Sequence, residues 1–234
     1  MIIDDEVKRY LLGTEISNGK RFKINRTDLF CRNDIYKEIS KGKRVLHMGC
    51  ADHIALIEEK RKKGTYLHDL IVESAHLAVG ADINLVALQK MKNLGIENLY
   101  HINDIPSNIK FDLVVVPDVI EHISNVGKFL VDLDKYNCPI AISTPNAYRF
   151  SNRLQLLSET VNTDHKYWFS PYTLAKTIYE AGYKVNKFYY TDTLNIRRPI
   201  SSAIKWWFPL VRDGLLFMIE KNSEKSEKTV LHKK

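Results

Sequence analysis

The sequence predicts an α/β fold built on a doubly wound sheet, and three observations support this. The apolar run at residues 44–48 ends at Gly49, which is typical of a buried strand followed by a tight turn. A second apolar run, residues 77–82, ends in an acid, Asp82. A strand, a glycine turn, a helix and an acid-tipped strand form the nucleotide-binding half of such a sheet. The third observation is the unbroken apolar run 113–116, as expected of a strand covered on both faces.

Length and composition indicate a globular protein. The chain has 234 residues, of which 44% are hydrophobic and 27% charged. It contains no apolar run of about 18 residues, so we expect no transmembrane helix, and its acidic start is unlike a secretory signal. The three cysteines, Cys31, Cys50 and Cys138, form no CxxC pair, which argues against disulfides or zinc and favours the cytoplasm. The net charge of +7 suits an anionic partner without identifying it.

The chain is predicted to form one domain, residues 44–221, between an N-terminal helical cover, residues 1–43, and a charged tail, residues 222–234. The tail is expected to be disordered. Within the cover, residues 27–40 begin with a capping-type Thr27 and have a loose apolar face, which predicts a short helix on the sheet edge. We expect this helix to be a plain cover; a role in gating the substrate is the alternative.

The chain between Gly49 and Asp82 is longer than a minimal strand–helix–strand unit needs. Residues 58–63 are all charged, which predicts a solvated face or loop, and residues 65–75 have helical spacing. Further helices are predicted at residues 85–95, 124–136, 152–160 and 170–182, and further strands at 99–102, within 111–123, and at 139–146, 183–192 and 214–222. Ser124 and Ser170 are the expected N-caps of two of these helices.

The ordered set of strand ends resembles that of the class I S-adenosylmethionine-dependent methyltransferases. The similarity spans roughly residues 40–220 and rests on RVLHMGCADH, GADI, IND, FDLVVVPDVIEHISN and AISTPN, which end the first five strands. DHKYWFSPYTLAKTIYEAGY resembles the segment before the sixth strand of small-molecule and sugar methyltransferases. The most similar branch is associated with bacterial glycan or lipid-linked saccharide biosynthesis, where some members share the form HxGCxD. The resemblance implies a Rossmann-like, seven-stranded, mostly parallel sheet whose last strand is antiparallel, and S-adenosylmethionine as the cofactor.

At the methionine end of the cofactor, the resemblance implies five contacts. Gly49 would let the cofactor approach the backbone, with the amides of Cys50 and Ala51 facing it. Pro117 and Asp118 would line the sulfonium end. Because the sulfonium is already an activated donor, the protein mainly has to place the acceptor in line with the methyl group.

At the nucleoside end, the resemblance implies contacts from the second and third strand ends. Asp82 would accept hydrogen bonds from both ribose hydroxyls. Ile83 and Ile105 would sandwich the adenine, and Asp104 would accept from its exocyclic amine.

The glycine loop departs from the usual pattern of the family. His47 stands where an acid is usual, and Ala51 and His53 stand where two more glycines are usual. A non-catalytic module that keeps the fold and binds a partner is therefore one alternative. A nicotinamide dehydrogenase is disfavoured, because GxGxxG is missing.

A general base helps transfer to a hydroxyl acceptor, and two histidines are candidates. His122 follows the fourth strand, and His165 lies on a loop that would cap the substrate. Their structural alternatives are a helix-start histidine bonded to backbone and a loop anchor. Tyr148, Asp164 and Tyr167 could orient an acceptor.

We predict no metal site, and the alternative is a site formed by Asp118, His122, Asp164 and His165. The Asp-Asn pair of catechol-type metal enzymes is absent, since residues 144–146 read TPN, and Glu121 is expected to be structural or adjacent to the cofactor.

Nucleic acid is not the expected substrate. The fourth strand is followed by PDVIEH, which is neither the turn used for adenine N-methylation nor a Pro-Cys nucleophile, and basic residues are spread along the chain. Residues 195–211 place Trp206 and Trp207 among cations such as Arg197 and Arg198, which is typical of an interfacial helix. Burial of the two tryptophans against the last strands is the alternative.

The sequence therefore predicts a cytoplasmic methyltransferase with possible contact to the inner membrane face through Trp206 and Trp207. Its acceptor is expected to be a small-molecule hydroxyl, on a sugar or a lipid-linked saccharide. N-methylation of an amino sugar or small amine is the alternative within the same class.

Overall fold

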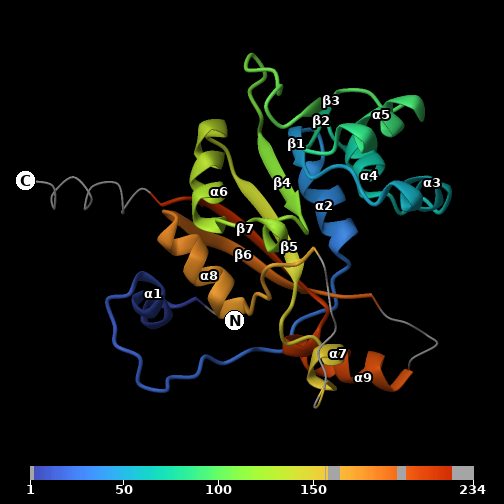
Figure 1. Cartoon of the computed structure of the whole chain (residues 1–234). Coiled ribbons are helices and arrows are strands. Elements are labelled where there is room, and N and C mark those ends of the chain that lie inside the picture. Colours follow the sequence, from blue (N-terminus) through green and yellow to red (C-terminus); the bar gives the residue numbers. More distant parts are fainter. Residues whose placement is uncertain (1–2, 156, 158–163, 194–198, 223–234) are drawn as a thin grey trace, which may run out of the picture.

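The computed structural model describes residues 3–155, 157, 164–193 and 199–222. A seven-stranded sheet of order β3-β2-β1-β4-β5-β7-β6 forms its centre (Figure 1). The strands are β1 (Arg44–Met48), β2 (Leu77–Asp82), β3 (Leu99–His101), β4 (Leu113–Pro117), β5 (Ile140–Pro145), β6 (Tyr183–Thr191) and β7 (Gly214–Lys221). The first five strands pair in parallel, and β7 runs antiparallel between β5 and β6. The Rossmann-like, mostly parallel sheet with an antiparallel last strand is confirmed.

Helices cover both faces of this sheet. They are α1 (Asp5–Leu12), α2 (Arg32–Ser40), α3 (Ile54–Lys62), α4 (Leu67–Ser74), α5 (Leu85–Asn93), α6 (Val126–Asp132), α7 (Phe150–Arg153), α8 (Pro171–Glu180) and α9 (Pro199–Trp207), with short 3-10 turns η1 (Ile120–His122), η2 (Leu133–Tyr136) and η3 (Pro209–Val211). Successive residues of a strand point to opposite faces, so Val45 joins the core formed with α2 and α4, and Leu46 joins the core formed with α6 and α8.

Helix α2 packs on a face of the sheet, and not on its edge as the sequence analysis expected. Its Ile35 and Tyr36 are buried against Val45 and Val115, which belong to the central strands β1 and β4. The helix therefore covers the sheet next to the ends of β1 and β4, where ligands of such sheets bind.

This helix also begins later than the predicted Thr27. The guanidinium of the fully buried Arg212 donates to the carbonyl oxygens of Thr27 at 2.7 Å and Asp28 at 2.6 Å, which holds this stretch outside a helix. Phe30 then forms a parallel bridge with Thr191 at the end of β6. The helix begins after these residues, because their backbone groups already have hydrogen-bond partners outside it.

Other elements differ in detail from their predictions. The charged run 58–63 lies mostly in a helix, α3, which buries Ile57 and exposes Glu58, Glu59 and Lys62. Asn125, and not Ser124, caps α6 through its side chain. Helix α7 ends at Arg153, so it precedes most of the predicted helix 152–160, part of which falls outside the described residues. Ser170 caps α8 as predicted, through a capping box.

Within the described part of the chain, no helix combines the length and the apolar character that crossing a membrane requires. The predicted charged tail falls almost wholly outside the described residues, as do Arg197 and Arg198. The boundaries of the predicted domain remain a prediction.

Candidate functional site

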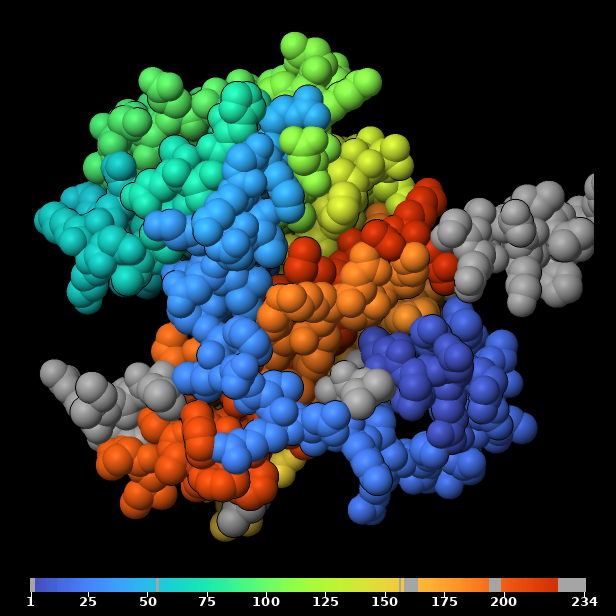
Figure 2. Space-filling model, turned by 180° about the vertical axis from the view of Figure 1, so that it is seen from behind, coloured from blue at the N-terminus to red at the C-terminus, as the bar shows by residue number. Residues whose placement is uncertain are grey.

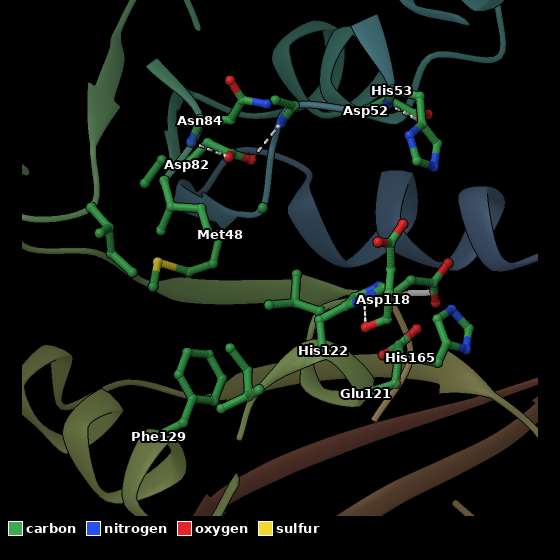
Figure 3. A pocket seen from close by; sticks show the side chains of 18 of the residues that line it. Met48, Asp52, His53, Asp82, Asn84, Asp118, Glu121, His122, Phe129 and His165 are labelled. Carbon is green, nitrogen blue, oxygen red and sulfur yellow. Dashed lines mark hydrogen bonds between the residues drawn. The ribbon is translucent and has the colours of Figure 1, made fainter. Parts of the chain in front are cut away.

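A cavity of about 850 Å³ opens at the carboxyl ends of the parallel strands. This is where open α/β sheets bind their ligands. Figure 3 shows Asp82 and Asn84 on one side of this cavity, and Glu121, His122 and His165 on the other. We call it the main cavity.

The turn after β1 is fixed by its backbone. Gly49 has a φ of +70°, and a Cβ on it would meet Cγ2 of Val119 at 2.3 Å, so only glycine fits here. The amides of Gly49 and Cys50 donate to the carbonyl of Ala81, at 2.8 and 3.2 Å. The amide of Ala51 donates to the Asp82 carboxylate at 3.0 Å. The Cys50 and Ala51 amides are thus both bonded within the protein, and Ala51 lines the main cavity, whereas Cys50 lines only a smaller one beside it.

Asp82 ends β2 with its carboxylate held at both oxygens. Oδ2 accepts from the amide of Ala51, and Oδ1 accepts from the amide of Asn84 at 2.8 Å. Each carboxylate oxygen has a second lone pair, so the group can still accept from two hydroxyls. The neighbouring Ile83 is exposed and lines the main cavity, as a contact to a flat ring would require.

The predicted adenine contacts after β3, Asp104 and Ile105, do not line the main cavity. Asp104 is exposed and does not line the main cavity, and Ile105 lines a separate cavity of about 750 Å³. The apolar wall is built instead by Met48, Ile102 and Phe129. Met48 could have been predicted from the sequence, because it is the last residue of β1. Phe129 could not, because it reaches this wall from α6, which follows β4 in the chain.

Asp118 lies directly after β4, with a φ of +50° that is strained for a residue with a side chain. Its carboxylate forms an ion pair with Arg32 of α2 and accepts a hydrogen bond from Ser143 Oγ at 2.9 Å. Asp118 lines the main cavity and two smaller ones beside it, whereas Pro117 lines only a smaller one. No sequence pattern indicated the contact of Arg32 with Asp118, because only the folded chain brings α2 to this strand end.

Glu121, His122 and His165 form a compact group that we call the Glu–His–His cluster. Oxygen Oε2 of Glu121 accepts from Thr144 Oγ1 at 3.0 Å, and the carboxylate is almost fully buried. Burial raises the pKa of Glu121 to about 7. The rings of His122 and His165 meet edge to face with centroids 4.8 Å apart. One potential ligand atom from each of the three residues lies within 4.8 Å of the other two.

The backbone holds the two histidines in place. Atom Nδ1 of His122 lies 2.8 Å from the carbonyl oxygen of Asp164, so Nδ1 carries a proton, and in the neutral ring Nε2 has the lone pair. The carbonyl of Glu121 accepts from the amides of Lys166 and Tyr167, at 2.8 and 3.3 Å. The structure therefore brings both predicted bases together. The hydroxyl of Tyr167 instead donates to the carbonyl of Ser124, and Tyr148 does not line the main cavity.

Two buried histidines lie behind the glycine turn. His47 of β1 and His68 of α4 are both buried, and their pKa values are lowered chiefly by this burial, that of His68 to about 4. His68 was not considered in the sequence analysis. His47 is thus a neutral group in the core, at the position where class I methyltransferases usually have an acid.

No protein-family model matches the chain, and no curated protein does. Among solved structures, an S-adenosylmethionine-dependent methyltransferase from Mesorhizobium loti is similar at a TM-score of 0.52, with 11% identity over 80% of this chain and 96% of that one. Magnesium protoporphyrin IX methyltransferase from Synechocystis, with bound SAH, is similar at a TM-score of 0.51, with 12% identity over 93% and 94%. The [4+2]-cyclase SpnF is similar at a TM-score of 0.50, with 11% identity over 81% and 80%.

These likenesses show that the fold is that of class I methyltransferases. The presence of a cyclase among them shows that the fold alone does not define the reaction, which has to be argued from the site.

Proposed function

We propose that this protein is an S-adenosylmethionine-dependent methyltransferase. The observation that carries the proposal is the carboxylate of Asp82, held at the end of β2 by two backbone amides with lone pairs left for a diol. The same cavity has suitable surfaces for a nucleoside and a methionine chain. They are the backbone at Gly49, the side chain of Ile83, and the apolar wall of Met48 and Phe129. When bound, S-adenosylmethionine supplies a methyl group carried by a sulfonium, and transfer of the methyl group turns this sulfonium into a neutral thioether.

The Glu–His–His cluster is proposed as the acceptor end of the site. It lies across the main cavity from Asp82 (Figure 3). An attacking hydroxyl loses its proton as its oxygen takes the methyl group, and Nε2 of His122 and the imidazole of His165 are the groups placed to handle that proton. Asp118, oriented by Arg32 and Ser143, would border the sulfonium end.

The proposed acceptor is a hydroxyl of a sugar or a lipid-linked saccharide. A second cavity, of about 360 Å³, begins at Asp118 and is lined by polar side chains, including Ser143, Arg149, Asp192 and Thr193. Such a lining suits a ligand with many hydroxyls, each of which needs a hydrogen-bond partner. Transfer to an amine, as in an amino sugar, is the alternative.

Peripheral contact with the inner membrane face is proposed through α9. Trp206 and Trp207 remain about half exposed, and Ile200 and Phe208 are more exposed still. The guanidinium carbon of Arg26 lies 3.9 Å from the centroids of both tryptophan rings. Figure 2 shows the N-terminal segment beside α9 on this side of the molecule. The buried alternative is disfavoured by this exposure, and a basic, aromatic surface suits anionic lipid.

Titration calorimetry of the full chain with S-adenosylmethionine, S-adenosylhomocysteine and NAD tests the proposed class. We expect saturable binding of the first two ligands and none of NAD. Transfer of a labelled methyl group to a panel of nucleotide-activated sugars, with amino sugars as a second arm, then separates oxygen from nitrogen acceptors. If neither S-adenosyl ligand binds, the chain is a module that has kept only the fold.

A further inference from the structure

The Glu–His–His cluster has the composition of a metal site as well as that of a proton acceptor. One carboxylate and two imidazoles are the three protein ligands of many catalytic metal sites, which leave further positions open for water or substrate. In this structure the three residues come from two segments, Glu121 and His122 from η1 and His165 from the loop before α8. Backbone hydrogen bonds tie these two segments together at Glu121.

Glu121 has one oxygen available for a ligand. Oε1 is buried without a hydrogen-bond partner, whereas Oε2 is engaged by Thr144. The residue is 1% exposed. Leaving a buried carboxylate oxygen without a partner is costly, and a cation at the cluster would remove this cost.

The partners around the cluster orient it as they would around a metal. Histidines that bind metals usually donate their other ring nitrogen to a carbonyl or carboxylate, and Nδ1 of His122 meets the carbonyl of Asp164 at 2.8 Å. This leaves Nε2 of His122 as the ligand atom. The hydroxyl of Thr144 fixes the carboxylate of Glu121 in the same way, at 3.0 Å.

The spacing is close to what a cation needs. The three ligand atoms lie within 4.8 Å of one another. Around a first-row divalent cation, with bonds of about 2.1 Å, such atoms come to roughly 3 to 3.5 Å apart, so the side chains have to close by about 1 Å. All three residues also line the main cavity, so the open positions of a bound cation would face the place proposed for the acceptor.

We propose that Glu121, His122 and His165 bind one divalent first-row transition-metal cation, whose open positions face the place proposed for the acceptor hydroxyl. Cation binding itself does not depend on the proposed function, but this role in the reaction rests on it. The bound hydroxyl ionises at a lower pH than a free one, its proton passes to water, and its oxygen then takes the methyl group. With the cation bound the two histidines act as its ligands, and the proton-accepting role proposed for them above applies to the cluster without a cation.

The test uses the full chain, stripped of metal with a chelator and titrated with Mn²⁺. Electron paramagnetic resonance follows the free Mn²⁺, and calorimetry on the same samples measures S-adenosylhomocysteine binding. We expect one Mn²⁺ per chain. Replacing a ligand, as in Glu121→Gln or His165→Ala, should weaken Mn²⁺ binding by more than the roughly 10- to 100-fold that loss of an outer partner costs. His53→Ala is the matched control, because His53 lines the same cavity outside the cluster and should leave Mn²⁺ affinity unchanged.

Folding is checked through thermal unfolding, since Mn²⁺ should raise the melting temperature of the wild type and of His53→Ala but not of the two cluster variants. Failure of the wild type to bind Mn²⁺ stoichiometrically would overturn the cation site. Glu121→Gln and His165→Ala variants that fold and bind Mn²⁺ with the affinity of the wild type would also overturn it. If S-adenosylhomocysteine binds and Mn²⁺ does not, the cation site fails while the proposed methyltransferase stands. If Mn²⁺ binds through the cluster and S-adenosylhomocysteine does not, the site stands and the methyltransferase proposal fails.

Discussion

The Nδ1 atoms of His47 and His68 lie 3.0 Å apart, inside the core and behind the glycine turn. One of these atoms must donate the hydrogen bond and the other accept it, so the pair as built holds no more than one proton between the two atoms. The two Nε2 atoms are buried without hydrogen-bond partners. Besides burial, charge on His68 and then on Arg32 lowers the pKa of His47, and the charge of Arg61 lowers the pKa of His68.

This pair predicts a loss of stability in mild acid. Both pKa values are lower in the folded state than the usual 6.5, so the unfolded chain binds more protons and unfolding becomes easier as pH falls. With a folded pKa of about 4, His68 alone should remove about 3 kcal/mol of the free energy of unfolding between pH 7 and pH 4. Urea denaturation at a series of pH values measures this loss.

His68→Leu should flatten that pH dependence even if it lowers stability at every pH. His76→Gln serves as its control, because His76 is exposed and should leave the slope unchanged. An unaltered slope in His68→Leu would show that the acid sensitivity has another origin.

Asp82 and Asp104 should contribute unequally to cofactor affinity. The Asp82 carboxylate is buried, held at both oxygens and part of the cavity wall, whereas Asp104 is exposed and outside it. Losing a charged hydrogen-bond partner typically costs about 1.5 to 3 kcal/mol, so Asp82→Ala should weaken S-adenosylhomocysteine binding by roughly 10- to 100-fold. Asp104→Ala should weaken it less. Calorimetry on both variants decides, and the reverse order would mean that the loop after β3 moves inward when the ligand binds.

Arg212 is predicted to hold the N-terminal cover onto the sheet. Its guanidinium is fully buried and donates to the backbone at Thr27, Asp28 and Lys205. Arg212→Leu would leave these buried carbonyls without partners, at about 1 to 3 kcal/mol for each one that water cannot reach. Urea denaturation should show a loss of at least about 3 kcal/mol, together with faster proteolysis between α1 and α2.

Arg212→Lys keeps the charge but only part of the donor fork, so we expect an intermediate loss. Wild-type stability in Arg212→Leu would contradict this account of the cover.

The aromatic surface of α9 predicts binding to anionic vesicles. Trp206→Ala/Trp207→Ala removes the two rings that stack on Arg26 and should reduce flotation with vesicles containing phosphatidylglycerol. Neutral vesicles and Leu154→Ala, an exposed apolar residue outside α9, provide the controls. Equal flotation of the wild type and the double variant would rule out membrane contact through these tryptophans.

Most of the sheet could be predicted because each strand is a short apolar run with a polar end. The run Leu113–Val116 and the acid at Asp82 are visible in the sequence without knowledge of the fold. The helix boundaries were less predictable where a distant group uses the backbone first, as Arg212 does at Thr27.

The site was predictable only where it follows from strand ends. Gly49, Asp82 and Asp118 line the main cavity for this reason. The ion pair of Arg32 with Asp118 and the contact between His47 and His68 join separate parts of the chain, and no local pattern announces such pairs. Glu121 adjoins a predicted base in the sequence, but its importance depends on burial, which only the packed chain reveals.

The antiparallel direction of β7 has a consequence for how this protein could diversify. Gly214, at the start of β7, pairs with Pro145, at the end of β5, so the chain enters β7 at the same edge where the parallel strands end. Segments next to α7 and α9 thereby border the cavity that begins at Asp118, while the wall with Met48 and Asp82 comes from β1 and β2. Insertions or exchanges in the second half of the chain could thus change the accepted molecule without disturbing the register of the first strands. Under the proposed function, recognition of the methyl donor and recognition of the acceptor would then reside in different parts of the chain.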